Sequence, residues 1–233
     1  MLDLHGYGPR LLEGAGVTLQ LALLSLLLAL VLGLLAASAK MSRSWLLHKT
    51  ATLYTTVIRG VPDLVLMLLL FFGGQMGLNL LTDLLYDRTG IDLFINLNAF
   101  AAGVLTIGFI FGAYMCETFR GAFLAVEHGQ IEAGKAYGMS NWLVFRRIRF
   151  PQMMRHALPG LSNNWMVLLK TTALVSVIGL SDMVRVAAEA SRATHEPFTF
   201  LIPVAVIYLM IASVSEWAFA RLQKRYNVGF GEH

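Results

Sequence analysis

The sequence predicts an all-α integral membrane protein, in which residues 1–233 form a single transmembrane domain with five membrane-spanning helices. The first observation is composition. Hydrophobic residues make up 57% of the chain and charged residues only 14%, whereas about 25% of the residues in a soluble domain are charged. The second observation is that the charged residues are bunched between apolar runs. Each run is long enough to cross a hydrocarbon core of about 30 Å as a helix.

The expected spans cover residues 17–39, 51–77, 99–119, 158–180 and 198–219. The first is almost uninterruptedly apolar. Gly60 and Pro62 interrupt the second near its start, so we expect its helix to bend or open there, because proline cannot donate a backbone hydrogen bond. The intervals 78–98 and 181–197 carry several charged residues and are expected to be polar connections.

The distribution of Lys and Arg predicts the orientation of these spans. One side of the membrane would hold Lys40, Arg43, Lys49, Arg120, Lys135, Arg146, Arg147, Arg149, Arg155, Arg221, Lys224 and Arg225. The other side would hold only Arg10, Arg88, Arg185 and Arg192. Since the richer side is cytoplasmic, five spans place the N-terminus outside and the C-terminus in the cytoplasm.

The longest polar interval, 126–151, lies on the predicted cytoplasmic side. From Ile131 to Tyr137, apolar or small residues alternate with the charged Glu132 and Lys135 at helical spacing. Gly138 then interrupts this helical pattern. A second short helix is expected over 141–150, with Asn141 as N-cap and Pro151 as the stop. Two short helices with a bend between them form a shape suited to docking. The alternative is an ordinary cytoplasmic loop with a solvated charged face.

The spacing of this loop resembles the EAA loop of ABC importer permeases, which couples a membrane subunit to its ATPase. The matching residues are Glu132, Ala133, Gly134, Gly138, Ile148 and Pro151. Gly134 stands where alanine is usual in that motif, and Phe150 stands where leucine is usual.

Four further segments resemble permeases of polar amino-acid ABC importers: 58–68, 117–122, 156–165 and 169–178. Within that family the chain is most similar to the Q-type permeases of histidine/lysine/arginine/ornithine systems and to their arginine-importer relatives. The resemblance implies the type I permease fold, the bacterial inner membrane and basic amino acids as substrates. It also implies a heterodimer with a second, similar permease, two cytoplasmic ATPase subunits that hold ATP and Mg, and a periplasmic binding protein. Many relatives carry an acidic residue where Thr171 stands.

Ionisable residues inside spans are costly and are therefore candidates for function. Their expected depths suggest two layers, Arg59 with Glu117 and Asp63 with Lys170. Asp63 follows the Gly60–Pro62 break, and broken helices are where transporters place their sites. The alternative is that each layer is a buried ion pair that only fixes packing. Polar residues that could also line a substrate path, or hydrogen-bond between helices, are Tyr114, Asn163, Asn164, Thr171 and Thr172.

Several function classes find no support in the sequence. It contains no phosphate-loop motif, no nucleophile–base set and no cluster of metal ligands, so we expect a non-enzymatic chain without a cofactor or metal of its own. The single Cys116 excludes an internal disulfide. The basic residues sit where membrane topology needs them, which argues against nucleic acid as a partner. Two alternatives stay open: a permease for another polar amino acid, such as glutamine or glutamate, and a membrane anchor that transports nothing.

Overall fold

The computed structural model describes residues 4–90 and 98–227, and all regular secondary structure there is helical. The α-helices are α1 (Gly8–Lys40), α2 (Trp45–Gly60), α3 (Asp63–Thr89), α4 (Ala99–Leu124), α5 (His128–Ala136), α6 (Asn141–Val144), α7 (Phe150–Thr171), α8 (Met183–Thr194) and α9 (Pro197–Tyr226). A π-helix, Phe145–Arg149, joins α6 to α7, and a 3-10 helix, Thr172–Ser176, follows α7. The prediction of an all-helical chain is confirmed for these residues.

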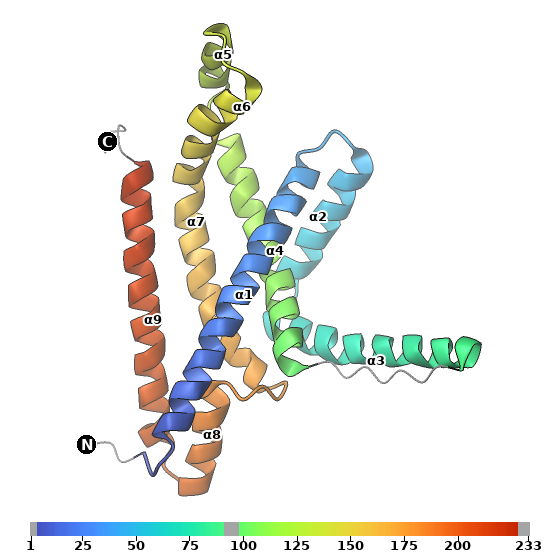
Figure 1. The fold of residues 1–233 in the computed structure, drawn as a ribbon, viewed down its shortest axis with the longest axis vertical. Coiled ribbons are helices and arrows are strands. Elements are labelled where there is room, and N and C mark those ends of the chain that lie inside the picture. Colours follow the sequence, from blue (N-terminus) through green and yellow to red (C-terminus); the bar gives the residue numbers. More distant parts are fainter. Residues whose placement is uncertain (1–3, 91–97, 228–233) are drawn as a thin grey trace.

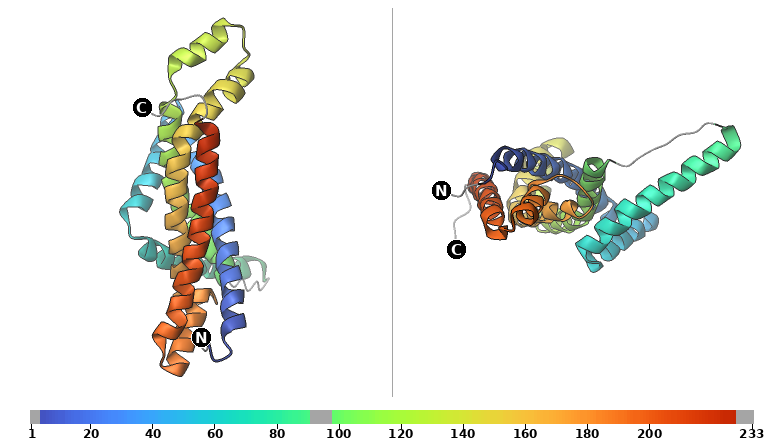
Figure 2. Two further views of the ribbon diagram at one scale, coloured as in Figure 1. Left: turned by 90° about the vertical axis from the view of Figure 1, so that its left-hand side faces the viewer. Right: turned by 90° about the horizontal axis from the view of Figure 1, so that it is seen from below.

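The long helices α1, α4, α7 and α9 run along one axis and form a bundle, with α5 and α6 at one end and α8 at the other (Figures 1 and 2). The central helix is α4, whose Ile107, Ile110 and Met115 are fully buried. Glycine lets α1 approach α4 closely, as is common between membrane helices. A Cβ at Gly33 would lie only 2.5 Å from the Cβ of Met115, and one at Gly108 only 2.6 Å from Leu28 Cδ2.

Four of the described helices are long and apolar enough to cross a membrane: α1, α3, α4 and α9. The chain therefore has several candidate spans, as predicted. The expected span 158–180 differs from the structure, because its helix begins at Phe150 and ends at Thr171. Helix α7 carries several polar side chains and packs between α4 and α9, which explains why its composition alone does not mark it as a span.

The expected span 51–77 is wrong as a single helix, although its predicted break is confirmed. Val61 is extended, with φ −108° and ψ 139°, and Pro62 follows it. A residue before proline is forced out of the helical region, so α2 ends at Gly60 and α3 starts in a new direction. Figures 1 and 2 show α3 projecting sideways from the bundle, across the direction of its long axis.

Both expected polar connections contain helix. The interval 78–98 was expected to be a connection, but α3 continues through its leucines to Thr89 and ends at Gly90, which has φ +67°. Residues 91–97 of that interval lie outside the described residues. In the second interval, the buried Asp182 caps α8 by accepting hydrogen bonds from the backbone N–H groups of Val184 and Arg185. These caps satisfy N–H groups that the start of a helix leaves unpaired.

The interval 126–151 contains the predicted first helix, α5, and the predicted break at Gly138, which has φ +77°. Two details of the second helix are wrong. The capping side chain is that of Ser140, whose Oγ accepts from Leu143 N–H, rather than that of Asn141. Pro151 does not stop the helix, because it lies in the first turn of α7, directly after the π-helix. A proline at that position is tolerated, and the wider π turn gives its ring room.

Candidate functional site

A polar pocket of about 380 Å³ lies between α1, α2 and α4. It brings together three of the predicted path residues, Arg59, Tyr114 and Glu117. Its other lining residues are Lys40, Thr55, Thr56 and Gly60. The pocket carries both positive and negative side chains. It can therefore offer polar partners to a charged solute.

Glu117 and Arg59 line the same pocket, as the expected layer suggests, but they do not form an ion pair, so the alternative of a buried Arg59–Glu117 pair is wrong. The Glu117 carboxylate instead accepts from Lys40 Nζ and, at 3.0 Å, from Arg120 Nε. The lysine stands in the last turn of α1, and close packing of α1 on α4 carries its side chain to Glu117. Arg120 follows Glu117 by three residues, on the same face of α4. The Lys40 side chain is only 11% exposed, which makes this contact a fixed link between the two helices.

Arg59 lines this pocket and Asp63 lies at the start of α3, and neither forms an ion pair with another described residue. The guanidinium of Arg59 lies 5.6 Å from the centroid of the Tyr114 ring, a cation–π distance. Asp63 is half-buried in the first turn of α3, where the helix dipole favours a negative charge. Tyr114 interacts electrostatically with both residues, so the three side chains form one group near the Val61–Pro62 break.

The alternative of a buried Asp63–Lys170 pair is also wrong, since no ion pair joins these two residues within the described part of the chain. Lys170 is exposed at the end of α7. Helix α3 turns away after Pro62 and packs against α4, whereas α7 packs against α4 and α9. A depth estimated from the sequence cannot show on which side of a helix a residue lies.

The remaining predicted path residues differ in their contacts. Asn164 Nδ2 donates to Thr118 Oγ1 at 3.0 Å and links α7 to α4. Thr171 Oγ1 donates to the Val167 carbonyl oxygen at 3.0 Å. Thr172 lies in the 3-10 helix, donates to the Leu169 carbonyl oxygen and has its Oγ1 3.3 Å from Tyr208 Oη on α9. These contacts are typical of helix packing, whereas Asn163 is exposed.

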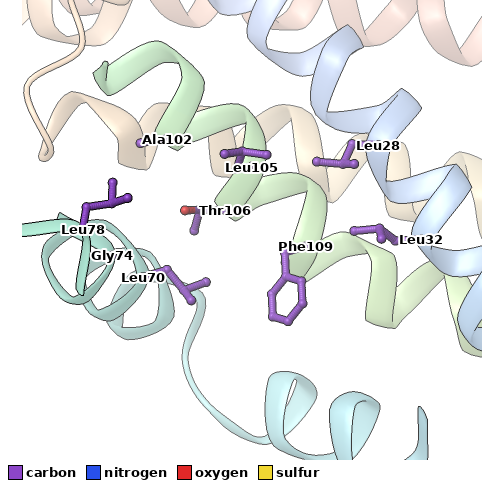
Figure 3. A pocket seen from close by; sticks show the side chains of 9 residues that line it. All are labelled: Leu28, Leu32, Leu70, Gly74, Leu78, Ala102, Leu105, Thr106 and Phe109. Atoms are coloured by element: carbon purple, nitrogen blue, oxygen red, sulfur yellow. The ribbon is translucent and has the colours of Figure 1, made fainter. Parts of the chain in front are cut away.

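A second cavity, of about 490 Å³, lies between α1, α3 and α4 (Figure 3). Leucines of α1 and α3 and the ring of Phe109 line it, and Thr106 is the polar side chain in its wall. A polar solute would lose its hydration there without gaining hydrogen bonds. We therefore place the candidate site for a charged solute at the pocket around Arg59 and not at this cavity.

The loop 126–151 is internally packed, so its exposed side chains are held in place. Gly134 is buried, and a Cβ there would lie 2.6 Å from Ile148 Cδ1, which explains why glycine stands where alanine is usual. The side chains of Gln130 and Gln152 form a hydrogen bond that ties α5 to α7. Glu132 and Ala133 are exposed on α5. 

The bend between α5 and α6 presents two large aromatic side chains. Tyr137 is 90% exposed and Trp142 is 68% exposed. Exposed aromatic groups on a packed scaffold are common at protein–protein interfaces. The sequence motif identified the other candidate coupling residues of the loop but did not include Tyr137 or Trp142.

The comparisons with known proteins agree with this architecture. Residues 29–228 match the family described as "Binding-protein-dependent transport system inner membrane component". The chain is 51% identical to the histidine/lysine/arginine/ornithine transport system permease protein HisQ of Salmonella typhimurium over 226 residues, which cover 97% of each protein. It is 44% identical to the nopaline transport system permease protein NocQ of Agrobacterium fabrum, covering 96% of this chain and 94% of that protein.

A solved structure extends the comparison to the fold. The crystal structure of an amino acid ABC transporter with histidines contains a chain that is 32% identical to this one, with a TM-score of 0.77. The match covers 94% of this chain and 95% of the other. Together with the candidate spans, these matches identify a multi-pass protein of the inner membrane. The chain belongs to the family of inner membrane components of binding-protein-dependent transport systems, the permease subunits of ABC importers.

Proposed function

We propose that the chain is the permease subunit of an ABC importer that carries the basic amino acids histidine, lysine, arginine and ornithine across the inner membrane. The observation that carries this proposal is the 51% identity to a HisQ permease over 97% of both chains. The half-buried Asp63, which forms no ion pair among the described residues, supports a cationic substrate, since a carboxylate removed from water is stabilised by a positive charge. A plain membrane anchor would have no use for such a group.

For the topology, we infer five crossings, made by α1, by α2 together with α3, and by α4, α7 and α9. The N-terminus would lie outside and the C-terminus in the cytoplasm. In support, α1 and α9 both begin at the α8 end of the bundle, and α9 ends at the other (Figure 1). A reporter fused after Arg225 should be cytoplasmic, and one inserted near Asp87 should be external. If both reporters lay on the same side, the number of crossings would be wrong.

The complete importer would contain a second, similar permease, two cytoplasmic ATPase subunits and a periplasmic binding protein. In this assembly ATP and Mg bind to the ATPase, and the chain described here needs no cofactor of its own. We assign the ATPase contact to the loop 126–151. Glu132, Ala133, Gly138 and the exposed aromatic side chains would face the ATPase, while Gly134, Ile148 and Pro151 set the shape of the loop.

The substrate path would pass the polar group at the Val61–Pro62 break. There Asp63 would meet the cationic side chain of the substrate, and Arg59 its α-carboxylate. Lys170, exposed at the end of α7, would meet the substrate at another point of the path. Tyr114 and Asn163 would border the path. Glu117, Asn164, Thr171 and Thr172 would hold the helices that form it, since their side chains bond to neighbouring helices or to their own backbone.

Uptake by proteoliposomes that contain the whole importer and its binding protein tests this path. Asp63→Asn should preserve assembly and basal ATPase activity but lower arginine uptake about tenfold, the effect of losing about 1.4 kcal/mol from a charge-assisted contact. Uncharged histidine should suffer less. Asp83→Asn removes the same charge from an exposed position of α3 and should have no effect. Unchanged arginine uptake by Asp63→Asn would contradict the assignment.

A further inference from the structure

A second polar pocket, of about 530 Å³, lies where α1 ends, α2 begins and α4 ends. Its lining residues are Lys40, Met41, His48, Thr52, Arg120 and Leu124. The pocket thus combines two cations, an imidazole and a hydroxyl with two apolar side chains, and no carboxylate lines it. It shares Lys40 with the pocket around Arg59 but opens at the end of the bundle that carries most of the Lys and Arg residues.

The charges around this pocket leave an excess of positive charge. Glu117 pairs with both Lys40 and Arg120, so the three side chains together carry one net positive charge. The Arg120 side chain is 41% exposed, and Glu117 is the sole carboxylate that it pairs with in the described part of the chain. His48 Nδ1 donates to the Lys40 carbonyl oxygen at 2.7 Å, which fixes the ring at the pocket. Arg43 and Lys49 are exposed close by in the chain.

The surroundings of the pocket have the features of a membrane interface. Trp45 is 68% exposed, and Lys49 Nζ lies 4.5 Å from the centroid of its ring. Tryptophan and lysine are typical anchors at the level of lipid headgroups. Leu53 and Leu124, which are 65% and 60% exposed, extend the apolar surface beside the polar residues. A basic pocket with an adjoining apolar surface matches both parts of an anionic phospholipid.

We propose that this pocket binds the phosphodiester headgroup of an anionic phospholipid of the inner leaflet. Arg120 would donate hydrogen bonds to the phosphate oxygens, and the acyl chains would lie against the exposed leucines. The position in the inner leaflet depends on the topology proposed above. The binding itself does not, because it follows from the residues that line the pocket. A soluble phosphate offers the same oxygens but gains nothing from the leucines, so the acyl chains should contribute to binding.

The test is native mass spectrometry of the complete importer, purified in detergent and titrated with dioleoyl-phosphatidylglycerol or dioleoyl-phosphatidylcholine. The importer should retain the anionic lipid preferentially. Arg120→Gln should lower this retention about fivefold, the typical effect of one cation at a lipid surface. Lys49→Gln is the matched control, because it removes the same charge outside the pocket. Thr52→Phe, which fills the pocket without changing its charge, should lower retention as well and keeps the test valid if Arg120→Gln does not assemble.

Three results would overturn the proposal. Equal retention of phosphatidylglycerol by the wild-type protein and Thr52→Phe would show that the pocket is not used. An equal loss in Lys49→Gln and Arg120→Gln would show diffuse attraction to surface charge. Glycerol 3-phosphate that displaces the lipid at equal concentration would show that the pocket takes a soluble phosphate and not a lipid. Failure of basic amino-acid uptake in the transport assay would leave the lipid result untouched.

Discussion

The ion pair between Lys40 and Glu117 should link α1 to α4, and removing it should destabilise the protein. The perturbation is Lys40→Met, which keeps the length of the side chain and deletes its charge. At an effective dielectric constant of about 20, two unit charges 3 Å apart attract by about 5.5 kcal/mol before desolvation is subtracted. The net coupling of such a pair is on the order of 1–3 kcal/mol. Side-chain exposures of 11% for Lys40 and 20% for Glu117 place this contact where solvent screens it little.

The assay is a double-mutant cycle of Lys40→Met and Glu117→Gln, read by thermal unfolding of the purified importer. We expect a coupling of about 2 kcal/mol, which corresponds to a shift of roughly 4–8 °C in the unfolding temperature of a chain of this length. The control is the same cycle with Arg59→Met in place of Lys40→Met, and its coupling should stay within about 0.5 kcal/mol. A larger coupling for Arg59 than for Lys40 would refute this assignment and would support the Arg59–Glu117 pair that the sequence leaves open as an alternative.

Further predictions concern the loop 126–151. Gly134→Val should weaken binding of the ATPase in a pull-down, because its Cβ would lie 2.6 Å from Ile148 Cδ1, and adding Ile148→Ala should restore binding. Gly138→Val should lower transport while membrane insertion persists, since a left-handed residue with a Cβ costs about 1–2 kcal/mol; Gly129→Val, at an ordinary φ, is its control. Glu132→Lys should lower transport without changing the unfolding temperature, because this side chain is exposed. Normal transport by both the Gly138 and Glu132 variants would argue against coupling through the loop.

Local chemistry explains which parts of the fold could be predicted from the sequence. The bend at Gly138 and the break at Pro62 follow from the backbone of single residues, and both are present. The predicted helix end at Pro151 is wrong. Whether a proline ends a helix depends on the residues before it, and here a π-helix precedes the proline. The polar connection expected around Asp83 and Asp87 is also wrong, because both residues lie in α3. Leucines between these charged residues continue the helix, and a helix that projects from the bundle can expose its charges.

The candidate site could be predicted less well, because the position of a charge along a span does not give its direction around the helix. Arg59 and Glu117 do share a pocket, as their expected layer suggested, and Tyr114 lines the same pocket. The ion pair of Glu117 with Lys40 was not predicted, because Lys40 was used only to infer the orientation of the spans. The contact with Glu117 spans 77 positions in the chain and depends on the close packing of α1 on α4. A contact between residues so far apart in the sequence cannot be seen in any local sequence pattern.

The continuity of α6, the π-helix and α7 has a mechanical consequence for the proposed coupling. Because Pro151 does not end the helix, no flexible linker separates the loop from the membrane bundle. The π-helix is itself anchored, since the guanidinium of Arg149 lies 5.3 Å from the centroid of the Phe123 ring on α4. A displacement of α5 by an ATPase would therefore reach the π-helix through the contact of Gly134 with Ile148, and from there α7 along the continuous helix and α4 through Arg149. Helix α4 carries Tyr114 and Glu117, so the same displacement would act on the pocket around Arg59.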